Sequence, residues 1–141
     1  MNKDDLNIIT QDAVVLLQQL IAIPSLSKEE DQTAVCIENF LKERGIPVHR
    51  VLNNLWACNK NAAISLPTIL LNSHHDTVAA NSAYTIDPYE SFIKDGKLYG
   101  LGSTDAGASL VSLMAAFIYF YDAVELPYNI VFAASAEEEI S

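Results

Sequence analysis

Several residue types are scarce in this sequence, and each shortage excludes a class of protein. Five glycines, five prolines and two cysteines in 141 residues exclude a collagen-like repeat, a low-complexity chain and a disulfide-stabilised scaffold. Eight basic residues against eighteen acidic ones leave a net charge of −10. Binding to nucleic acid or to anionic lipid needs a basic surface. We therefore expect neither nucleic acid nor a membrane as a partner.

The cysteines and the apolar segments indicate a soluble protein of a reducing compartment. Cys36 and Cys58 are not spaced as a metal-ligand pair, so we expect both to be small buried apolar residues. Residues 1–5 lack the basic and then apolar pattern of a signal peptide. The longest apolar segment, 110–121, is too short to cross a bilayer and is interrupted by Ser112. The sequence predicts a cytoplasmic location.

Half of the residues are apolar, which is typical of a folded globular chain. Apolar spacing predicts helices from Thr10 to Ile23, from Ser27 to just before Gly45, and from about Ala106 to Asp122. We expect Thr10 to cap the first helix, and Ser27 with Glu30 to form a capping box for the second. Strands are expected at 46–60 (one or two), 67–73 and 128–134, with a hairpin at 92–99. This alternation predicts an α/β fold.

The most informative stretch is the strand predicted at 67–73, because it ends in His74, His75 and Asp76. Side chains alternate between the faces of a strand, so His74 and Asp76 project to one side and His75 to the other. A carboxylate beside an imidazole can hold one ring nitrogen and so orient the other toward a metal. We expect the strand itself to be buried.

Two further polar clusters follow other predicted elements: Asp105, after the turn 100–104, and the triplet Glu137, Glu138 and Glu139. Taken singly, Asp105 is typical of a helix N-cap and the glutamates of a solvated turn. Strand ends in an open α/β sheet converge, however, and imidazole with carboxylates is a ligand set that suits zinc. A glutamate that is not a ligand could accept a proton from metal-activated water. Spacing alone does not distinguish the three glutamates.

Other sites are poorly supported by the sequence. Gly100-Leu101-Gly102 lacks the third glycine of a dinucleotide loop and the lysine of a P-loop, and there is no Gly-x-Ser-x-Gly elbow. A receiver-like signalling domain would need an acidic pair after its first strand and a late lysine. The first strand-like segment instead runs into Lys60, and Lys97 is the last lysine.

Three motifs together resemble the M20 family of zinc metallopeptidases, which groups acetylornithine deacetylases, succinyl-diaminopimelate desuccinylases, aminoacylases and related carboxypeptidases. Residues 73–78 match a small-His-x-Asp-x-Val motif, residues 100–105 match Gly-x-Gly-x-x-Asp, and residues 135–139 resemble Thr-x-Asp-Glu-Glu. Ile23-Pro24-Ser25 and Asp87-Pro88-Tyr89 fit as well. The resemblance extends over essentially the whole chain.

The resemblance implies a role for each site residue. His74 would bind one zinc ion, Glu139 the other, and Asp105 both, with Co²⁺ as a possible substitute for zinc. Glu138 would be the general base, and Asp76 would orient His74. The resemblance also implies a cis peptide bond after Asp105. The substrate would be a small N-acyl amino acid or peptide, and the complete protein could be a homodimer.

The chain departs from the family pattern in two places. Ala106-Gly107-Ala108 stands where many members have Met-Lys-Gly, which removes a cation, and Glu137 replaces an aspartate. Members of the family are much longer. We therefore expect residues 1–141 to be an incomplete catalytic domain, without the remaining metal ligands, the lid or dimerisation domain and the C-terminal catalytic part.

Together these features predict an α/β fold, the N-terminal part of a zinc-exopeptidase-like catalytic domain with a mixed sheet flanked by helices. The predicted function is zinc-dependent hydrolysis of an amide bond in N-acyl amino acids, in the manner of acetylornithine deacetylase. The 141 residues alone are expected to be inactive. The alternatives are an M20 dipeptidase or carboxypeptidase, and a non-catalytic metal-binding relative.

Overall fold

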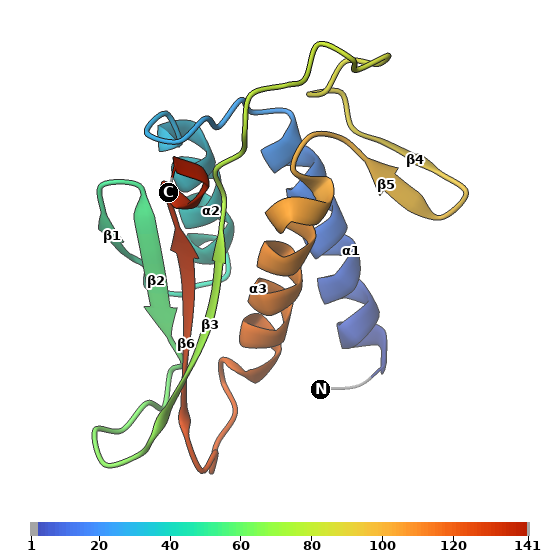
Figure 1. Ribbon diagram of the computed structural model, residues 1–141. Helices are drawn as coiled ribbons and strands as arrows, with labels where there is room; N and C mark the ends of the chain where they lie inside the picture. The colour runs from blue at the N-terminus through green and yellow to red at the C-terminus, as the bar shows by residue number, and fades with distance from the viewer. Residues whose placement is uncertain (1–2, 141) are drawn as a thin grey trace.

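The computed structural model describes residues 3–140, which form a four-stranded sheet, three α-helices and a separate hairpin (Figure 1). The helices are α1 (Lys3–Ile21), α2 (Asp31–Lys42) and α3 (Ser109–Phe120). The sheet contains β1 (His49–Val51), β2 (Asn54–Cys58), β3 (Thr68–His74) and β6 (Asn129–Ser135), and the hairpin contains β4 (Phe92–Lys94) and β5 (Lys97–Tyr99). Two short helical turns, η1 (Ser103–Ala108) and η2 (Glu138–Ile140), complete the fold.

The sheet is mixed, with strand order β1-β2-β6-β3. β3 and β6 run parallel, whereas β1 with β2 and β2 with β6 are antiparallel. The predicted α/β class with a mixed sheet flanked by helices is therefore confirmed. The register pairs His74, the last residue of β3, with Ser135, the last residue of β6. The two parallel strands thus end side by side, and the segments that follow them leave the same edge of the sheet.

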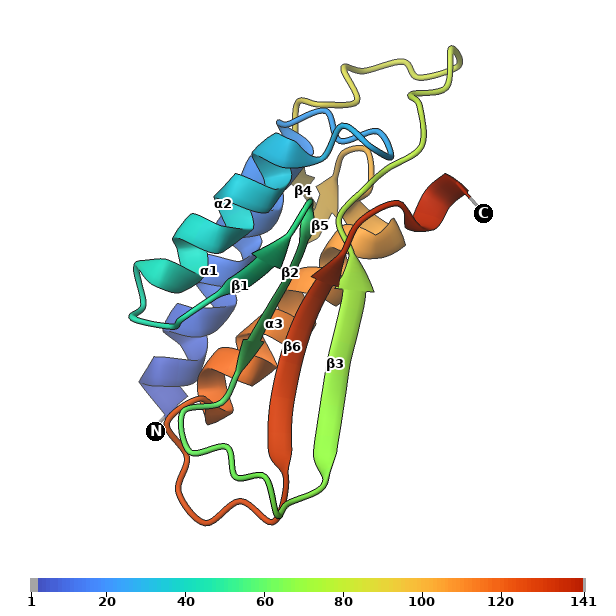
Figure 2. The ribbon, with the colours of Figure 1, turned by 90° about the vertical axis from the view of Figure 1, so that its left-hand side faces the viewer.

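The core lies between one face of the sheet and the helices, which Figure 2 shows together behind the strands. Ile130, Phe132 and Ala134 alternate along β6 as buried residues, as expected when one face of a strand is covered. Phe117 of α3 is fully buried, and its ring centroid lies 5.9 Å from that of Phe132. This packing fixes α3, and with it the preceding turn η1, against the parallel pair β3 and β6.

The apolar helix α3 and the turn before it meet the length and composition of a membrane span. Residues 103–120 are long and apolar enough to cross a membrane, with 18 residues and a mean hydropathy of 1.3. In this fold the segment instead packs against α1 and the sheet, with Leu110, Val111, Met114 and Phe117 buried. Core helices of soluble proteins meet the same length and hydropathy criteria.

Most predicted elements are present, but three local expectations were wrong. α1 begins at Lys3, with Asp4 and Asp5 in its first turn, where acidic residues favour a helix start. Thr10 therefore lies inside the helix, and its hydroxyl donates to the carbonyl of Leu6 at 2.8 Å. Ser27 and Glu30 do not form a capping box, because the Ser27 side chain binds Asp76 and the Glu30 side chain binds Asn53 and Glu137.

Burial also differs from the expectation in two places. β3 was predicted to be buried, but it is an edge strand of the part described, and Leu70 is 60% exposed. The side chains of Leu70 and Leu71 project to opposite faces of the sheet, and Leu71 packs on the core. Cys58 is exposed and Cys36 is half-buried, so neither is the fully buried residue that we expected.

Candidate metal centre

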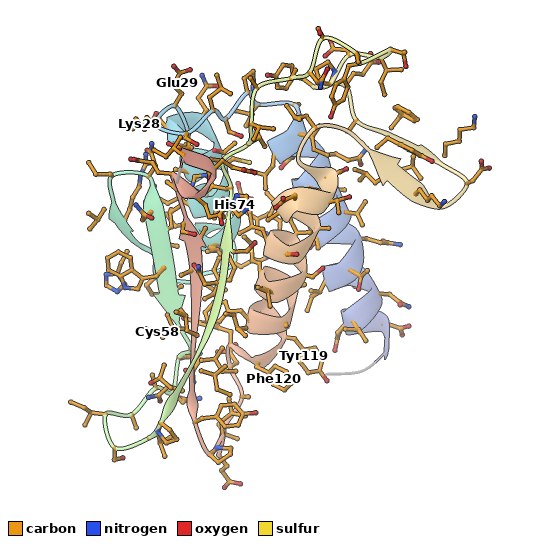
Figure 3. The ribbon with its side chains drawn as sticks, viewed as in Figure 1. Lys28, Glu29, Cys58, His74, Tyr119 and Phe120 are labelled. Atoms are coloured by element: carbon orange, nitrogen blue, oxygen red, sulfur yellow. The ribbon has the colours of Figure 1, made fainter. Side chains whose placement is uncertain are left out.

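The candidate site lies where β3 and β6 end, next to the start of α3. Figure 3 shows His74 toward the upper end of the sheet, whereas Cys58 lies toward its lower end and Phe120 lies at the lower end of α3. His74 is buried, whereas Asp105 from η1 is exposed and Glu139 from η2 is half-buried. One ligand atom from each of these three residues lies within 4.8 Å of the other two. Three segments that are distant in sequence thus bring an imidazole and two carboxylates together.

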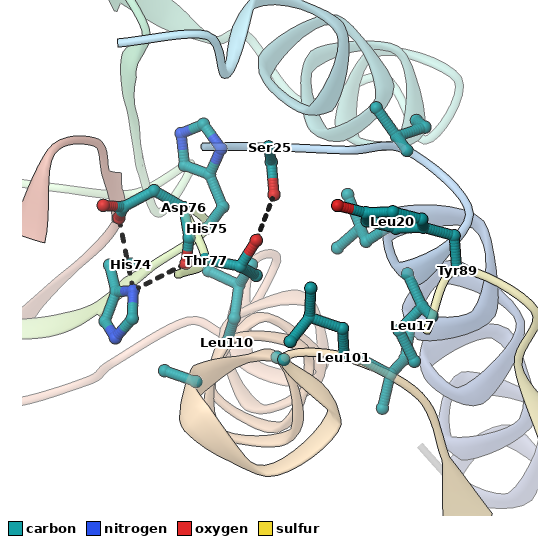
Figure 4. Close-up of a pocket in the computed structure, with 15 residues that line it drawn as sticks. Leu17, Leu20, Ser25, His74, His75, Asp76, Thr77, Tyr89, Leu101 and Leu110 are labelled. Atoms are coloured by element: carbon teal, nitrogen blue, oxygen red, sulfur yellow. Dashed lines mark hydrogen bonds and ion pairs between the residues drawn. The ribbon is translucent and has the colours of Figure 1, made fainter. Parts of the chain in front are cut away.

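The two ring nitrogens of His74 face different partners. Nδ1 lies 3.1 Å from the backbone carbonyl of Asp76 and 3.2 Å from its carboxylate Oδ1 (Figure 4). Nε2 lies 3.2 Å from Oδ1 of Asp105 and 3.6 Å from Oε2 of Glu138. Since Asp76 occupies the Nδ1 side, Nε2 is the nitrogen directed toward the acidic groups. This arrangement agrees with the prediction that His74 and Asp76 lie on one face, although the hydrogen bond of Nδ1 is with the carbonyl of Asp76 and not with its carboxylate.

The surroundings of His74 favour a positive charge in that region. Burial of the imidazole lowers its pKa, but the Asp76 carbonyl and the Asp105 carboxylate, with the charge of Asp76, raise it more, so the net pKa lies above its usual value. The same concentration of oxygen atoms that favours a proton on the imidazole also favours a divalent cation beside it.

The Asp76 carboxylate joins three segments. Its Oδ2 accepts hydrogen bonds from the Ser27 hydroxyl at 2.7 Å and from the Glu139 N–H at 3.0 Å. Burial raises the pKa of this carboxyl, but these donors outweigh it and hold the pKa below its usual value. The other oxygen, Oδ1, is buried and has no hydrogen-bond partner in the part of the chain described. Asp76 is therefore held as a carboxylate with one oxygen still free to interact with the imidazole of His74.

Asp105 reaches the site on a tight turn. Gly102 adopts a left-handed conformation (φ 72°), and its carbonyl accepts a hydrogen bond from the Gly107 N–H at 2.8 Å. The peptide bond between Asp105 and Ala106 is cis, as the family resemblance implied. Asp105 does not cap α3, since the N-cap position is Ala108. Its carboxylate instead faces His74, which is the arrangement expected of a ligand and not of a cap.

The structure separates the three consecutive glutamates. Glu138 places a carboxylate oxygen 3.6 Å from His74, whereas Glu139 supplies the third atom of the ligand group. Glu137 has a positive φ of 61°, and its backbone N–H donates to Oε1 of Glu30 at 3.1 Å. The predicted roles of Glu138 as base and Glu139 as ligand remain predictions.

His75 lies on the opposite face from His74, as predicted. Its Nε2 donates to the carbonyl of Asn53 at 2.9 Å, and its Nδ1 lies 2.9 Å from the Thr33 hydroxyl. Burial lowers the pKa of this imidazole, so the neutral ring is favoured. His75 thus links the end of β3 to α2 and to the turn between β1 and β2.

The sequence did not predict which residues hold the candidate site residues in place through hydrogen bonds. Ser27 and Glu30 were assigned to a capping box, because their spacing matches that motif. In the fold Ser27 binds the Asp76 carboxylate, and Glu30 binds the Glu137 amide and the side-chain amide of Asn53. A fully buried glutamate needs polar partners, but the sequence gives no indication of Glu30 burial.

A family profile for the peptidases M20/M25/M40 matches residues 70–141. Among curated relatives, the succinyl-diaminopimelate desuccinylase of Corynebacterium glutamicum is 32% identical over 133 residues, which cover 92% of this chain and 34% of the relative. The chain therefore spans about a third of the length of this relative.

Solved structures share the fold. An M20 metallo-carboxypeptidase from Sulfolobus solfataricus aligns with a TM-score of 0.75 and 21% identity, over 99% of this chain and 32% of its own. A dinuclear metal-binding M20 peptidase from Bacillus subtilis aligns with a TM-score of 0.66 and 21% identity, over 99% of this chain and 37% of its own.

Proposed function

Because this chain belongs to the peptidase family M20/M25/M40, whose members are metal-dependent hydrolases, we propose that its site serves zinc-dependent hydrolysis of an amide bond in N-acyl amino acids. The observation that carries the proposal is the group His74, Asp105 and Glu139, whose ligand atoms lie within 4.8 Å of one another. One imidazole nitrogen and two carboxylates suit zinc, with Co²⁺ as a substitute. We propose two ions per complete site, with Asp105 bridging them.

Each side chain has a task in the proposed reaction. His74 would present Nε2 as a ligand while Asp76 holds Nδ1, and Asp105 and Glu139 would supply carboxylate oxygens. Zinc, when bound, lowers the pKa of water to roughly 7 and polarises the scissile carbonyl. Glu138 would accept the proton of the attacking water and then pass it to the leaving amine nitrogen. Its carboxylate oxygen, 3.6 Å from His74 Nε2, lies beside the ligands without belonging to their group.

The substrate proposal rests on the family and on the relatives. N-acetylornithine is the first substrate to test, on the family resemblance of the motifs. N-succinyl-diaminopimelate is the second, because the Corynebacterium relative is a desuccinylase of that compound by name. A dipeptide tests the alternative of peptidase activity, which the carboxypeptidase neighbour favours. A relative that binds metal without catalysis would turn over none of them.

We further propose that the 141 residues are the N-terminal part of a longer cytoplasmic hydrolase that can form a homodimer, and that they do not turn over substrate alone. The share of the desuccinylase that they cover, 34%, supports this proposal. Turnover of N-acetylornithine by the isolated chain with added zinc would contradict it. In the complete protein we expect hydrolysis that Glu138→Gln abolishes.

The metal site can be tested on the chain itself by calorimetric titration with zinc. His74→Ala should lower zinc affinity by more than the roughly 10- to 100-fold that loss of a supporting residue costs. The matched control is His49→Ala, because His49 is exposed on β1 and stacks on Trp56, away from the site. Equal zinc binding by wild type and His74→Ala would refute the proposed site.

A further inference from the structure

Glu30 is a fully buried carboxylate that the proposed reaction does not use. It is 0% exposed, and it precedes α2 directly. Its Oε1 accepts the N–H of Lys28 at 2.8 Å and the N–H of Glu137 at 3.1 Å, and its Oε2 accepts the Asn53 side-chain amide at 2.9 Å. No salt bridge to Glu30 occurs within residues 3–140. Neutral donors from three segments therefore compensate its buried charge.

Two of these donors come from unusual backbone conformations. Lys28 has φ 77° and Glu137 has φ 61°, in the left-handed region that residues with a side chain rarely adopt. Both direct their N–H groups to the same oxygen atom of Glu30. A charge-assisted hydrogen bond is roughly twice as strong as a neutral one. The carboxylate can therefore offset the cost of holding these two residues in that conformation.

A second buried carboxylate binds the same acidic segment two residues further on. Asp76 accepts the N–H of Glu139 at 3.0 Å, just as Glu30 accepts the N–H of Glu137. The residues on both sides of Glu138 are thus anchored through their backbones to carboxylates of other segments. With its neighbours held, the backbone of Glu138 is fixed at the point from which its carboxylate lies 3.6 Å from His74.

We propose that Glu30 is a positioning residue of the metal centre, which holds Glu137–Glu139 in the conformation that presents Glu138 and Glu139 to the site. Asn53 completes the arrangement by occupying the second oxygen of Glu30. This inference rests on the proposed function for its consequence in metal binding. Its structural part, the anchoring of the Glu137 amide, can be measured without metal.

The pair Glu30 and Asn53 allows an exchange of donor and acceptor. In Glu30→Gln the new amide faces the amide of Asn53, so two donors oppose each other, and the acceptor loses its charge. In Asn53→Asp two carboxylates face each other. In the double variant Glu30→Gln/Asn53→Asp the new amide can donate to the new carboxylate, while the glutamine oxygen still accepts from Lys28 and Glu137. Glu29→Gln is the matched control, since Glu29 is an exposed glutamate next to Glu30.

Two measurements on the 141-residue chain test the proposal: amide exchange of Glu137 by NMR without metal, and zinc affinity by calorimetry. Glu30→Gln should speed exchange of the Glu137 amide at least tenfold and weaken zinc binding roughly 10- to 100-fold. Asn53→Asp should likewise speed amide exchange and weaken zinc binding, and the double variant should recover most of each loss. Glu29→Gln should change neither. If the wild-type chain binds no zinc, the proposed function fails, while the exchange rates still test the anchor.

Unchanged exchange and zinc affinity in Glu30→Gln would overturn the inference. A double variant that binds zinc no better than the sum of the single losses predicts would overturn it as well. Circular dichroism shows whether each variant folds. If Glu30→Gln does not fold, the double variant tests the proposal instead. Zinc binding by the double variant like that of the wild type would support the anchoring role of Glu30. A double variant that is unfolded, or that folds without binding zinc, would overturn it.

Discussion

Replacement of Gly102 by alanine tests why the turn that carries Asp105 contains glycine. Gly102 has φ +72°, and a Cβ atom added there would lie 2.6 Å from Cγ2 of Thr77. The left-handed conformation costs a residue with a side chain about 1–2 kcal/mol. Overpacking of a tight site costs a further 1–3 kcal/mol or so. Gly102→Ala should therefore lower the free energy of unfolding by about 2–5 kcal/mol.

Gly96 in the β4–β5 hairpin offers a matched control. It has the same φ, +72°, but a Cβ atom there would meet nothing within 4 Å. Gly96→Ala should thus cost only the conformational term of about 1–2 kcal/mol. Any entropy effect of alanine on the unfolded chain is common to both variants. The difference between them, about 1–3 kcal/mol, therefore isolates the contact with Thr77.

Urea denaturation followed by circular dichroism measures both variants, and Thr77→Ser removes the clashing methyl group. In the Thr77→Ser background the next atom near the new Cβ is the Asp105 carbonyl oxygen at 3.6 Å, an ordinary contact. Gly102→Ala should then cost no more than Gly96→Ala. Equal costs of the two glycine variants in the wild-type background, or an unchanged difference with Thr77→Ser, would refute the reasoning.

Two further predictions concern the core and the acid side of the stability profile. Phe117→Ala should lower the free energy of unfolding by about 3–5 kcal/mol, measured by urea denaturation, whereas Val124→Ala, at a position 73% exposed, should change it by less than about 0.5 kcal/mol. Burial raises the pKa of Glu30, but its hydrogen-bond donors outweigh it and hold the pKa below the usual 4.5. As the pH falls, Glu30 therefore takes up a proton in the unfolded chain at a higher pH than in the folded chain. The free energy of unfolding should decline below about pH 4.5 more steeply in the wild type than in Glu30→Gln. Parallel declines of the urea midpoint with pH in the two proteins would contradict this.

The sequence predicted those parts of the fold that depend on local patterns. The strand before His74, the last strand and the Asp95-Gly96 hairpin were found at their expected places, because periodicity and turn residues determine them within a few positions. The capping box failed for a reason outside its own segment. Ser27 and Glu30 have the right spacing, but Asp76 and Glu137 offer their side chains stronger partners once the chain is folded. A motif that depends on weak local hydrogen bonds is replaced when a buried charge needs the same groups.

The acidic triplet Glu137–Glu139 also shows that distant contacts, which sequence patterns do not reveal, determine the site. Three consecutive identical residues carry no positional signal, so sequence spacing could not assign their roles. In the fold they differ through partners that lie 107 and 63 residues away, since the Glu137 amide binds Glu30 and the Glu139 amide binds Asp76. These bonds fix the backbone on either side of Glu138, whose carboxylate lies 3.6 Å from His74. The general base proposed for this site is therefore determined less by its own side chain than by two distant carboxylates that hold its neighbours.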